Sequence, residues 1–506
     1  MKQFVTPLIF LFLSQWAFSN SADSLFKQSE KWFMLHQNWL PASTWNPANN
    51  HLLPINTYRI AEINYTSENK KETTLSYQGN KNTQYDFNNY GFQRLKNITI
   101  DGAFQYKNGK DKAVQWSNVA DYERLYPYIL ADSTMGNNNY EQYFLSGTYT
   151  QKINDFILAT HCSYSAYGSY QTSDPRTKTT VSDLRTHLGI IKELPNHYAG
   201  ISFMAGRYRQ KAGSSSKKEH RVDYFYINRG LGNYDREFSA ERKSISVKYH
   251  GYNLGTSIEW LPKNDNALWL ASKAVWEIND LRYKSEQVLT QSNNRELDLQ
   301  IGYRGYKNQL LQHITLDALW HKKNGKEYYY ESVIVNPETK AIDYRLLSTS
   351  DKYERNIYQL TSSANFRIKR TPSIAWFATA KAGVANWKEI YRLPKAKQEL
   401  TSGIFQIKTN WLKQFKASQL IVDAHVEYLP VIDSFSNVKN TLKPAARQTI
   451  PDFQIQSQDR WNYLLQMTYK RPLKEETLLN IRLLFHESTI KNSNAFAMQM
   501  AIGIQF

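Results

Sequence analysis

The residues with the greatest capacity for chemistry are three polar side chains that alternate along one short stretch: Asp423, His425 and Glu427. Residues two apart on a β-strand point to the same face, so an extended chain presents all three together. Imidazole and carboxylate groups together are suitable ligands for a metal ion. The same mixture also suits the lining of a wide barrel, where charges of both signs are hydrated and pair across strands. A metal or substrate site and an ordinary hydrated lining therefore both remain open.

Other charged residues lie on the polar face of alternating segments in the same way. They are Asp183, Arg185, Lys273, Glu277, Asp317, Lys381, Lys408 and Arg482. A lining of mixed acidic and basic groups tunes the selectivity of a channel. The alternative is that these charges interlock and close the pore.

Signatures of the common enzyme classes are missing from the sequence. It contains no Gly-x-Ser-x-Gly, His-Glu-x-x-His, Walker or Cys-x-x-Cys motif, and its single cysteine, Cys162, cannot form an internal disulfide. We therefore expect no enzyme activity, no catalytic residues, no cofactor and no resident metal ion.

The last twelve residues of the chain give the clearest signal for the elements that hold these side chains. Large apolar residues alternate there with small or polar ones. The apolar set is Phe496, Met498, Met500, Ile502, Ile504 and Phe506. A strict period of two predicts a strand with one apolar face. A final aromatic residue at the edge of that face is typical of the strand that closes a transmembrane β-barrel.

The rest of the chain repeats this strand pattern, with connections that alternate in length. Short polar connections such as 471–476 and 369–373 alternate with long polar stretches. The long stretches are 209–240, 281–294, 322–355, 385–401 and 429–460. Short periplasmic turns and long extracellular loops are typical of outer-membrane barrels. We predict an all-β, antiparallel transmembrane barrel of about eighteen strands, with sixteen as the second choice.

Aromatic residues at the strand ends provide a separate test of this interpretation. If the last strand ends in the periplasm, one rim contains Tyr149, Trp260, Tyr303, Phe366, Trp411, Tyr469 and Phe506. The outer rim then contains Tyr106, Tyr164, Trp276, Trp320, Tyr428, Phe485, Trp461 and Phe496. Two aromatic girdles are expected where a barrel meets the two membrane interfaces. After the first dozen or so residues no apolar run reaches about eighteen residues, which argues against an α-helical span.

The chain divides into three predicted parts. Residues 1–22 have a short basic start and an apolar core, which predict a secretory signal peptide. Residues 23–56 do not alternate, and either fill the barrel mouth as a plug or extend into the periplasm. Residues 57–506 form the predicted barrel. Within it, the stretch 126–133 is unusually apolar for an external loop, so it either constricts the lumen, clasps a partner or packs on a neighbouring loop.

The formal charge of +18 is carried mainly by loop-like stretches such as 211–221 and 388–397. Because these residues form no basic stripe, we expect no nucleic-acid partner. Outer-membrane lipid and lipopolysaccharide are the simpler partners for these charges, and assembly of such a barrel implies the barrel-assembly machinery. We place the protein in the outer membrane of a Gram-negative bacterium.

Several stretches in the first half of the chain resemble a known family. They are 78–81, 90–102, 108–110, 126–133, 174–176 and 182–183. The chain resembles an uncharacterised family of Bacteroidota-type outer-membrane β-barrel proteins, carried under a domain-of-unknown-function label. The resemblance implies location and fold, and it supplies no catalytic residues.

Two functions follow as expectations. The first is a channel or transport-associated, porin-like barrel for a small solute, because sixteen to eighteen strands enclose an aqueous lumen. The second is a closed barrel that acts as a surface scaffold, whose long loops bind a partner transporter, a secretion component or a ligand.

Overall fold

The computed structural model describes residues 45–70, 75–217, 223–235, 238–264, 266–283, 287–307, 310–336, 341–371, 374–415, 418–438, 446–474, 477–491 and 493–506. The predicted signal peptide, 1–22, and residues 23–44 of the predicted N-terminal segment lie outside this part of the chain. Among the described helices, none has the length and apolar character needed to cross a membrane.

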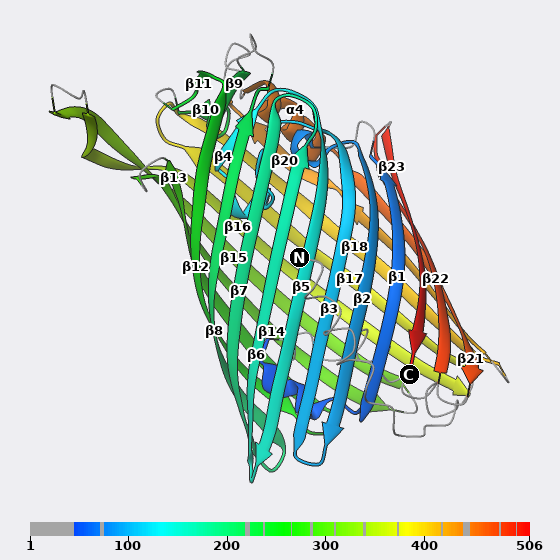
Figure 1. The fold of residues 1–506 in the computed structure, drawn as a ribbon. Coiled ribbons are helices and arrows are strands. Elements are labelled where there is room, and N and C mark those ends of the chain that lie inside the picture. Colours follow the sequence, from blue (N-terminus) through cyan, green and yellow to red (C-terminus); the bar gives the residue numbers. More distant parts are fainter. Residues whose placement is uncertain are drawn as a thin grey trace, which may run out of the picture.

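Eighteen antiparallel strands form one closed barrel, so the predicted fold is confirmed (Figure 1). The strands are β1 (Thr57–Asn69), β2 (Lys81–Leu95), β3 (Ile98–Val114), β5 (Gly136–Ile153), β6 (Phe156–Gln171), β7 (Arg176–Glu193), β8 (His197–Ser215), β12 (Ser244–Pro262), β13 (Ala267–Tyr283), β14 (Gln287–Lys307), β15 (Leu310–Asn336), β16 (Ala341–Thr371), β17 (Ile374–Tyr391), β18 (Ala396–Gln414), β19 (Gln419–Leu429), β21 (Arg460–Lys474), β22 (Thr477–Ile490) and β23 (Ser493–Gln505). Each strand pairs with the next in sequence. The barrel closes where Ile60 to Asn69 of β1 pair with Gln505 to Phe496 of β23.

The outer face of the barrel is apolar because the strands alternate as the sequence predicts. On the terminal strand the six apolar side chains are all exposed, whereas Ala501 and Gln505 between them are buried. Ten of the predicted rim aromatics are also exposed: Tyr149, Trp260, Tyr303, Phe366, Tyr469, Phe506, Tyr164, Trp276, Trp461 and Phe496. An apolar band with aromatic residues at both edges is the surface that lipid requires. The protein is therefore an outer-membrane barrel.

The two ends of the barrel differ in their connections. At the periplasmic end the turns are short, as at 96–97, 154–155 and 194–196. Three of the stretches expected as long outer loops are largely strand instead: 281–294, 322–355 and 385–401. Backbone pairing continues there past the aromatic rim, since a paired strand satisfies the hydrogen-bonding groups that a loop leaves to water. After β19, the short strand β20 (Val431–Ser436) also pairs with β18.

The described residues of the long outer connections 115–135 and 216–243 fold inward and form a second, smaller sheet. Its strands are β4 (Tyr128–Asp132), β9 (Asp223–Gly230), β10 (Asn233–Tyr234) and β11 (Ala240–Arg242), and β9 pairs with the other three. All five residues of β4 are buried. Leu130 and Ile227 pack with Tyr208, Tyr249 and other residues of the barrel's inner wall. The apolar stretch 126–133 therefore packs on a neighbouring loop and on the wall.

The described helices are short and lie at the two ends of the lumen. They are the 3-10 helices η2 (Pro47–Leu52) and η4 (Ser76–Gln78) and the α-helices α3 (Tyr122–Leu125) and α4 (Ala446–Gln456). The element η2 lies within the periplasmic end of the barrel, near the foot of the ribbon in Figure 1. There the Asn46 amide donates to the carbonyl oxygens of Ile190 and Ile201, both at 3.3 Å. The helix α4 lies at the outer end.

Candidate functional site

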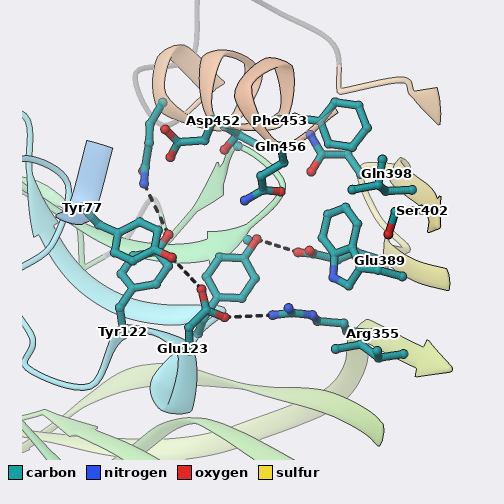
Figure 2. Close-up of a pocket in the computed structure, with 18 of the residues that line it drawn as sticks. Tyr77, Tyr122, Glu123, Arg355, Glu389, Gln398, Ser402, Asp452, Phe453 and Gln456 are labelled. Carbon is teal, nitrogen blue, oxygen red and sulfur yellow. Dashed lines mark hydrogen bonds and ion pairs between the residues drawn. The ribbon is translucent and has the colours of Figure 1, made fainter. Parts of the chain in front are cut away.

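A pocket of about 390 Å³ lies at the outer end of the barrel, and we call it the vestibule pocket (Figure 2). Its walls come from separate parts of the chain: η4, α3 with the residue after it, β9 with the β9–β10 turn, strands β16 to β18, the end of β19 with the start of β20, and α4 with the start of β21. The lining residues used below are Tyr77, Tyr122, Glu123, Tyr126, Asn228, Arg355, Trp387, Glu389, Gln398, Gln448, Asp452, Phe453, Gln456 and Arg460. Because these parts are distant in sequence, only the folded barrel creates the pocket.

A buried lysine holds the wall of the pocket that α3 forms. The Lys323 side chain, on β15, donates to the carbonyl oxygens of Glu123 at 2.8 Å, Arg124 at 3.3 Å and Tyr126 at 2.9 Å. Carbonyl groups at the end of a helix lack partners within the helix, and a cation there is favourable. Lys323 is 2% exposed, so this contact anchors α3 to the barrel interior.

The same loop is tied across the lumen by Arg124. Its guanidinium group forms an ion pair with Asp183 of β7 at 2.9 Å and a second with Glu277 of β13. The guanidinium carbon also lies 3.9 Å from the centre of the Tyr208 ring. The loop 115–135 is thus joined to strands on two parts of the inner wall.

The carboxylate groups of the pocket are already engaged by protein partners. Glu123 forms an ion pair with Arg355 at 3.2 Å and accepts a hydrogen bond from the Tyr77 hydroxyl at 2.7 Å. Glu389, which is 1% exposed, accepts a hydrogen bond from the Tyr126 hydroxyl at 2.5 Å. Figure 2 shows the first pair below the cavity and the second at its side. A charged ligand would have to compete with these contacts.

The helix α4 forms the outer side of the pocket and is docked by one carboxylate. Asp452 accepts hydrogen bonds from the backbone N–H and the hydroxyl of Ser76, both at 2.9 Å. Burial raises the pKa of the Asp452 carboxyl above its ordinary value of 3.8, and the hydrogen bonds from Ser76 and Gln448 oppose that rise. Gln448 also donates to the Tyr122 hydroxyl at 3.3 Å.

Several aromatic rings line the pocket. Tyr77 and Tyr122 stack in parallel with ring centres 3.6 Å apart, and Trp387 stacks with Phe453 at 6.2 Å. The Arg355 guanidinium lies 5.5 Å from the Trp387 ring centre. Within the described part of the chain, the buried Nε1 of Trp387 and Oδ1 of Asn228 have no hydrogen-bond partner.

The predicted site residues lie on the barrel strands, and none of them lines the vestibule pocket. Asp423 accepts hydrogen bonds from Asn410 and, at 3.0 Å, from Gln466, and Glu427 accepts one from Asn462 at 2.7 Å. The Nε2 atom of His425 is buried and has no hydrogen-bond partner among the described residues. The described part of the chain contains no group of three or more His, Cys, Asp or Glu side chains that is arranged to hold a metal ion.

The other predicted charges mostly pair across or along the strands. Asp183 binds Arg185 at 2.8 Å as well as Arg124, Lys273 binds Glu296 at 2.8 Å, and Arg482 binds Glu62 at 3.1 Å. Glu277 is the second partner of Arg124. Asp317, Lys381 and Lys408 are half-buried on β15, β17 and β18. Their alternation with apolar neighbours predicts strands, but it carries no information on their partners.

The residues that build the pocket were missed because their positions depend on loop packing. The apolar stretch 126–133 was the one available signal, since a loop that exposes such residues to water is unfavourable. Arg124, Lys323 and Glu389 follow no motif. The sequence pattern places residues 446–456 within a long external stretch, and nothing in their spacing identifies α4 as a wall of the pocket.

Several solved structures are similar in fold to this chain, at low sequence identity. Among solved structures it is similar to BauA, the ferric preacinetobactin receptor from Acinetobacter baumannii, at 7% identity and a TM-score of 0.40, over 88% of this chain and 80% of that one. It is also similar to the copper transporter OprC, at 7% identity and a TM-score of 0.42, over 88% and 80% of the two chains. A third is the siderophore receptor PiuA from Acinetobacter baumannii, at 7% identity and a TM-score of 0.39, over 88% and 82%.

A comparison with the curated proteins found no match. The model of a family described as "Family of unknown function (DUF6850)" matches residues 47–506, which include the whole barrel and most of the segment at its periplasmic end. The chain belongs to this family of unknown function.

Proposed function

We propose that the protein is a transport-associated barrel that captures a small solute in the vestibule pocket and passes it into the lumen. The observation that carries this proposal is the pocket itself, which parts of the chain distant in sequence line at the outer end of the barrel. Its volume of about 390 Å³ falls within the range typical of small-molecule sites, roughly 300 to 1,000 Å³.

At the other end of the lumen, residues 45–56 lie in the path of a solute, and we call them the inner segment. Asn49 donates to both carboxylate oxygens of Glu259 on β12, at 3.0 and 2.9 Å. Arg94 donates to the carbonyl oxygens of His51, at 2.7 Å, and Leu53. These contacts support a role for the inner segment as a plug that closes the periplasmic end.

Two glycines on the barrel wall provide the space for the inner segment. A Cβ atom at Gly189 would lie 2.1 Å from Oδ1 of Asn46 and 3.0 Å from ring carbons of Pro47. A Cβ atom at Gly200 would lie 2.3 Å from Oε1 of Glu259 and 2.9 Å from Nδ2 of Asn46. A bulky side chain at Gly189 therefore forces the inner segment from its position, whereas one at Gly200 first meets the flexible end of Glu259.

Solute flux through liposomes that contain the purified full-length chain tests this function. We expect slow flux of a small neutral solute through the wild type and at least fivefold faster flux through Gly189→Val, because the larger side chain displaces the plug. The matched control is Gly168→Ala, since a Cβ at Gly168 meets nothing within 4 Å. Equal flux through folded wild type and Gly189→Val, with folding checked by heat-modifiable migration, contradicts the proposal.

The surface-scaffold alternative is favoured by one observation, the hairpin of β15 and β16. These strands have 27 and 31 residues and project well beyond the rest of the barrel in Figure 1. Val333, Leu346 and Leu347 are exposed on it. Under this alternative, a partner transporter or secretion component copurifies with the wild type and is lost when the hairpin is shortened.

Three further expectations from the sequence remain predictions. They are contact with lipopolysaccharide, insertion by the barrel-assembly machinery, and a Bacteroidota source.

A further inference from the structure

We propose that the vestibule pocket binds a neutral, hydroxyl-rich ligand of the size of a mono- or disaccharide. This inference rests on the proposed function, because it names the class of solute that the pocket captures. It is carried by three properties of the pocket: its charge, its aromatic and amide surface, and its unpaired buried polar atoms.

The charges of the pocket do not select a charged ligand. Three carboxylates line it, Glu123, Glu389 and Asp452, against two guanidinium groups, Arg355 and Arg460. Each carboxylate already accepts hydrogen bonds from protein donors. An anionic ligand would meet an excess of negative groups, and a cationic ligand would find every carboxylate engaged. A neutral ligand disturbs none of these contacts.

The remaining surface matches the two kinds of surface on a sugar ring. The flat C–H faces of a pyranose pack against aromatic rings, and Trp387 and Phe453 present such rings at one side of the pocket. Sugar hydroxyls both donate and accept hydrogen bonds, as does the side-chain amide of Gln456. Figure 2 shows Gln456 extending from α4 toward the centre of the cavity.

Two buried polar atoms of the pocket have no hydrogen-bond partner in the described structure. One is a donor, Nε1 of Trp387, and the other is an acceptor, Oδ1 of Asn228. Leaving such atoms unpaired is unfavourable, so a ligand that supplies partners gains affinity. Hydroxyl groups can satisfy both atoms, whereas a carboxylate can satisfy only the donor and an ammonium group only the acceptor.

Binding of matched sugars to the purified full-length protein tests the inference. The probes are glucose and maltose, with glucuronate and glucosamine as the anionic and cationic counterparts of glucose, and glycylglycine as a small peptide. We expect saturable binding of glucose or maltose by calorimetry, with affinity at least fivefold higher than for any of the other three probes. Tighter binding of glucuronate, glucosamine or glycylglycine, or no saturable sugar binding up to about 50 mM, more than tenfold weaker than a millimolar Kd, overturns it.

Variants on α4 show whether the sugar occupies this pocket. Gln456→Ala removes an amide that lines the pocket, and we expect at least threefold weaker sugar binding. Gln454→Ala, on the same helix but exposed and outside the pocket, is the matched control and should bind as the wild type does. Trp387→Phe keeps a ring and loses the N–H donor, so it should also weaken binding. Unchanged affinity in both pocket variants overturns the assignment to this pocket.

Flux measurements separate a failure of this inference from a failure of the proposed function. If glucuronate binds better than glucose and the barrel still transports small solutes after plug displacement, the ligand class is wrong and the transport function stands. If sugars bind in the pocket and the displaced-plug variant gives no flux of any solute, the ligand class stands and the transport function is wrong.

Discussion

At the scale of single residues, Arg124 joins a loop to the barrel wall through two ion pairs. Its side chain is 14% exposed, and those of Asp183 and Glu277 are 15% and 17% exposed. Removing one partner of a largely buried ion pair leaves a charge without compensation, which costs about 3 to 5 kcal/mol. Asp183 retains Arg185 as a partner, so the cost here lies at or below the lower end of that range.

The corresponding prediction is that Arg124→Ala loosens the docking of residues 115–135 by about 2 to 3 kcal/mol. Backbone amides of that loop should then exchange with deuterium about 30- to 150-fold faster, since a factor of ten corresponds to about 1.4 kcal/mol. Adding Asp183→Asn and Glu277→Gln should recover part of the protection, because the uncompensated charges are removed. Unchanged exchange in Arg124→Ala contradicts the prediction.

Asp452 predicts an unusual response of α4 to pH. Burial raises the pKa of its carboxyl in the docked state above the value of the undocked state, so the docked state binds a proton more strongly. Docking is therefore strengthened as the pH falls through that raised pKa, and the gain is absent at higher pH.

Hydrogen-exchange protection factors for residues 446–456, corrected for the intrinsic effect of pH, should accordingly be higher near pH 4.5 than at pH 7.5. Asp452→Asn carries no titrating group, and its protection should not change over that interval. Protection that falls on acidification in the wild type shows that the carboxylate is stabilised by its hydrogen bonds more than it is penalised by burial.

At the scale of elements, the strands could be predicted and the folding of the loops could not. Alternation within 461–469 or 496–506 reports which face meets lipid, because lipid contact acts on every second residue alike. The pairing of β4 with β9 has no such local signature. It depends on two loops that meet in the lumen, and on Tyr208 and Tyr249 beneath them.

The projecting β15–β16 hairpin is predicted to be a removable element. Tyr330 and Leu346 pair directly, so the segment 331–345 can be replaced by Asn-Gly, which favours a two-residue hairpin turn. We expect an unchanged unfolding midpoint and unchanged solute flux, because Val333 is exposed and Leu346, at the new turn, is also exposed. A large loss of barrel stability contradicts this expectation, and loss of a copurifying protein favours the scaffold alternative.

At the scale of the whole molecule, the barrel depends on an apolar band that contacts lipid on all its strands. Ile502 is 48% exposed on β23 and lies between the two aromatic edges formed by Phe496 and Phe506. A strand of about 9 to 11 residues, tilted by about 45°, spans the membrane, which agrees with that interval. A charge at this depth cannot be hydrated without disturbing the bilayer.

Ile502→Lys should therefore destabilise the barrel by about 2 to 4 kcal/mol in urea unfolding from lipid vesicles. The matched control is Ile432→Lys on β20, where the native side chain is 63% exposed beside Asp433 beyond the rim, and it should have an effect near zero. Equal destabilisation by both substitutions is incompatible with the assigned membrane band.

By itself the sequence determined the architecture and location of this protein: an antiparallel barrel of about eighteen strands in the outer membrane. These properties follow from a period-two pattern that each strand carries locally, because every strand meets lipid on one face. The tertiary structure alone decided what the barrel encloses. Only packing brings together residues 59 to 376 positions apart. Such residues form the vestibule pocket, the Arg124 ion pairs, and the contacts of the inner segment with the barrel wall.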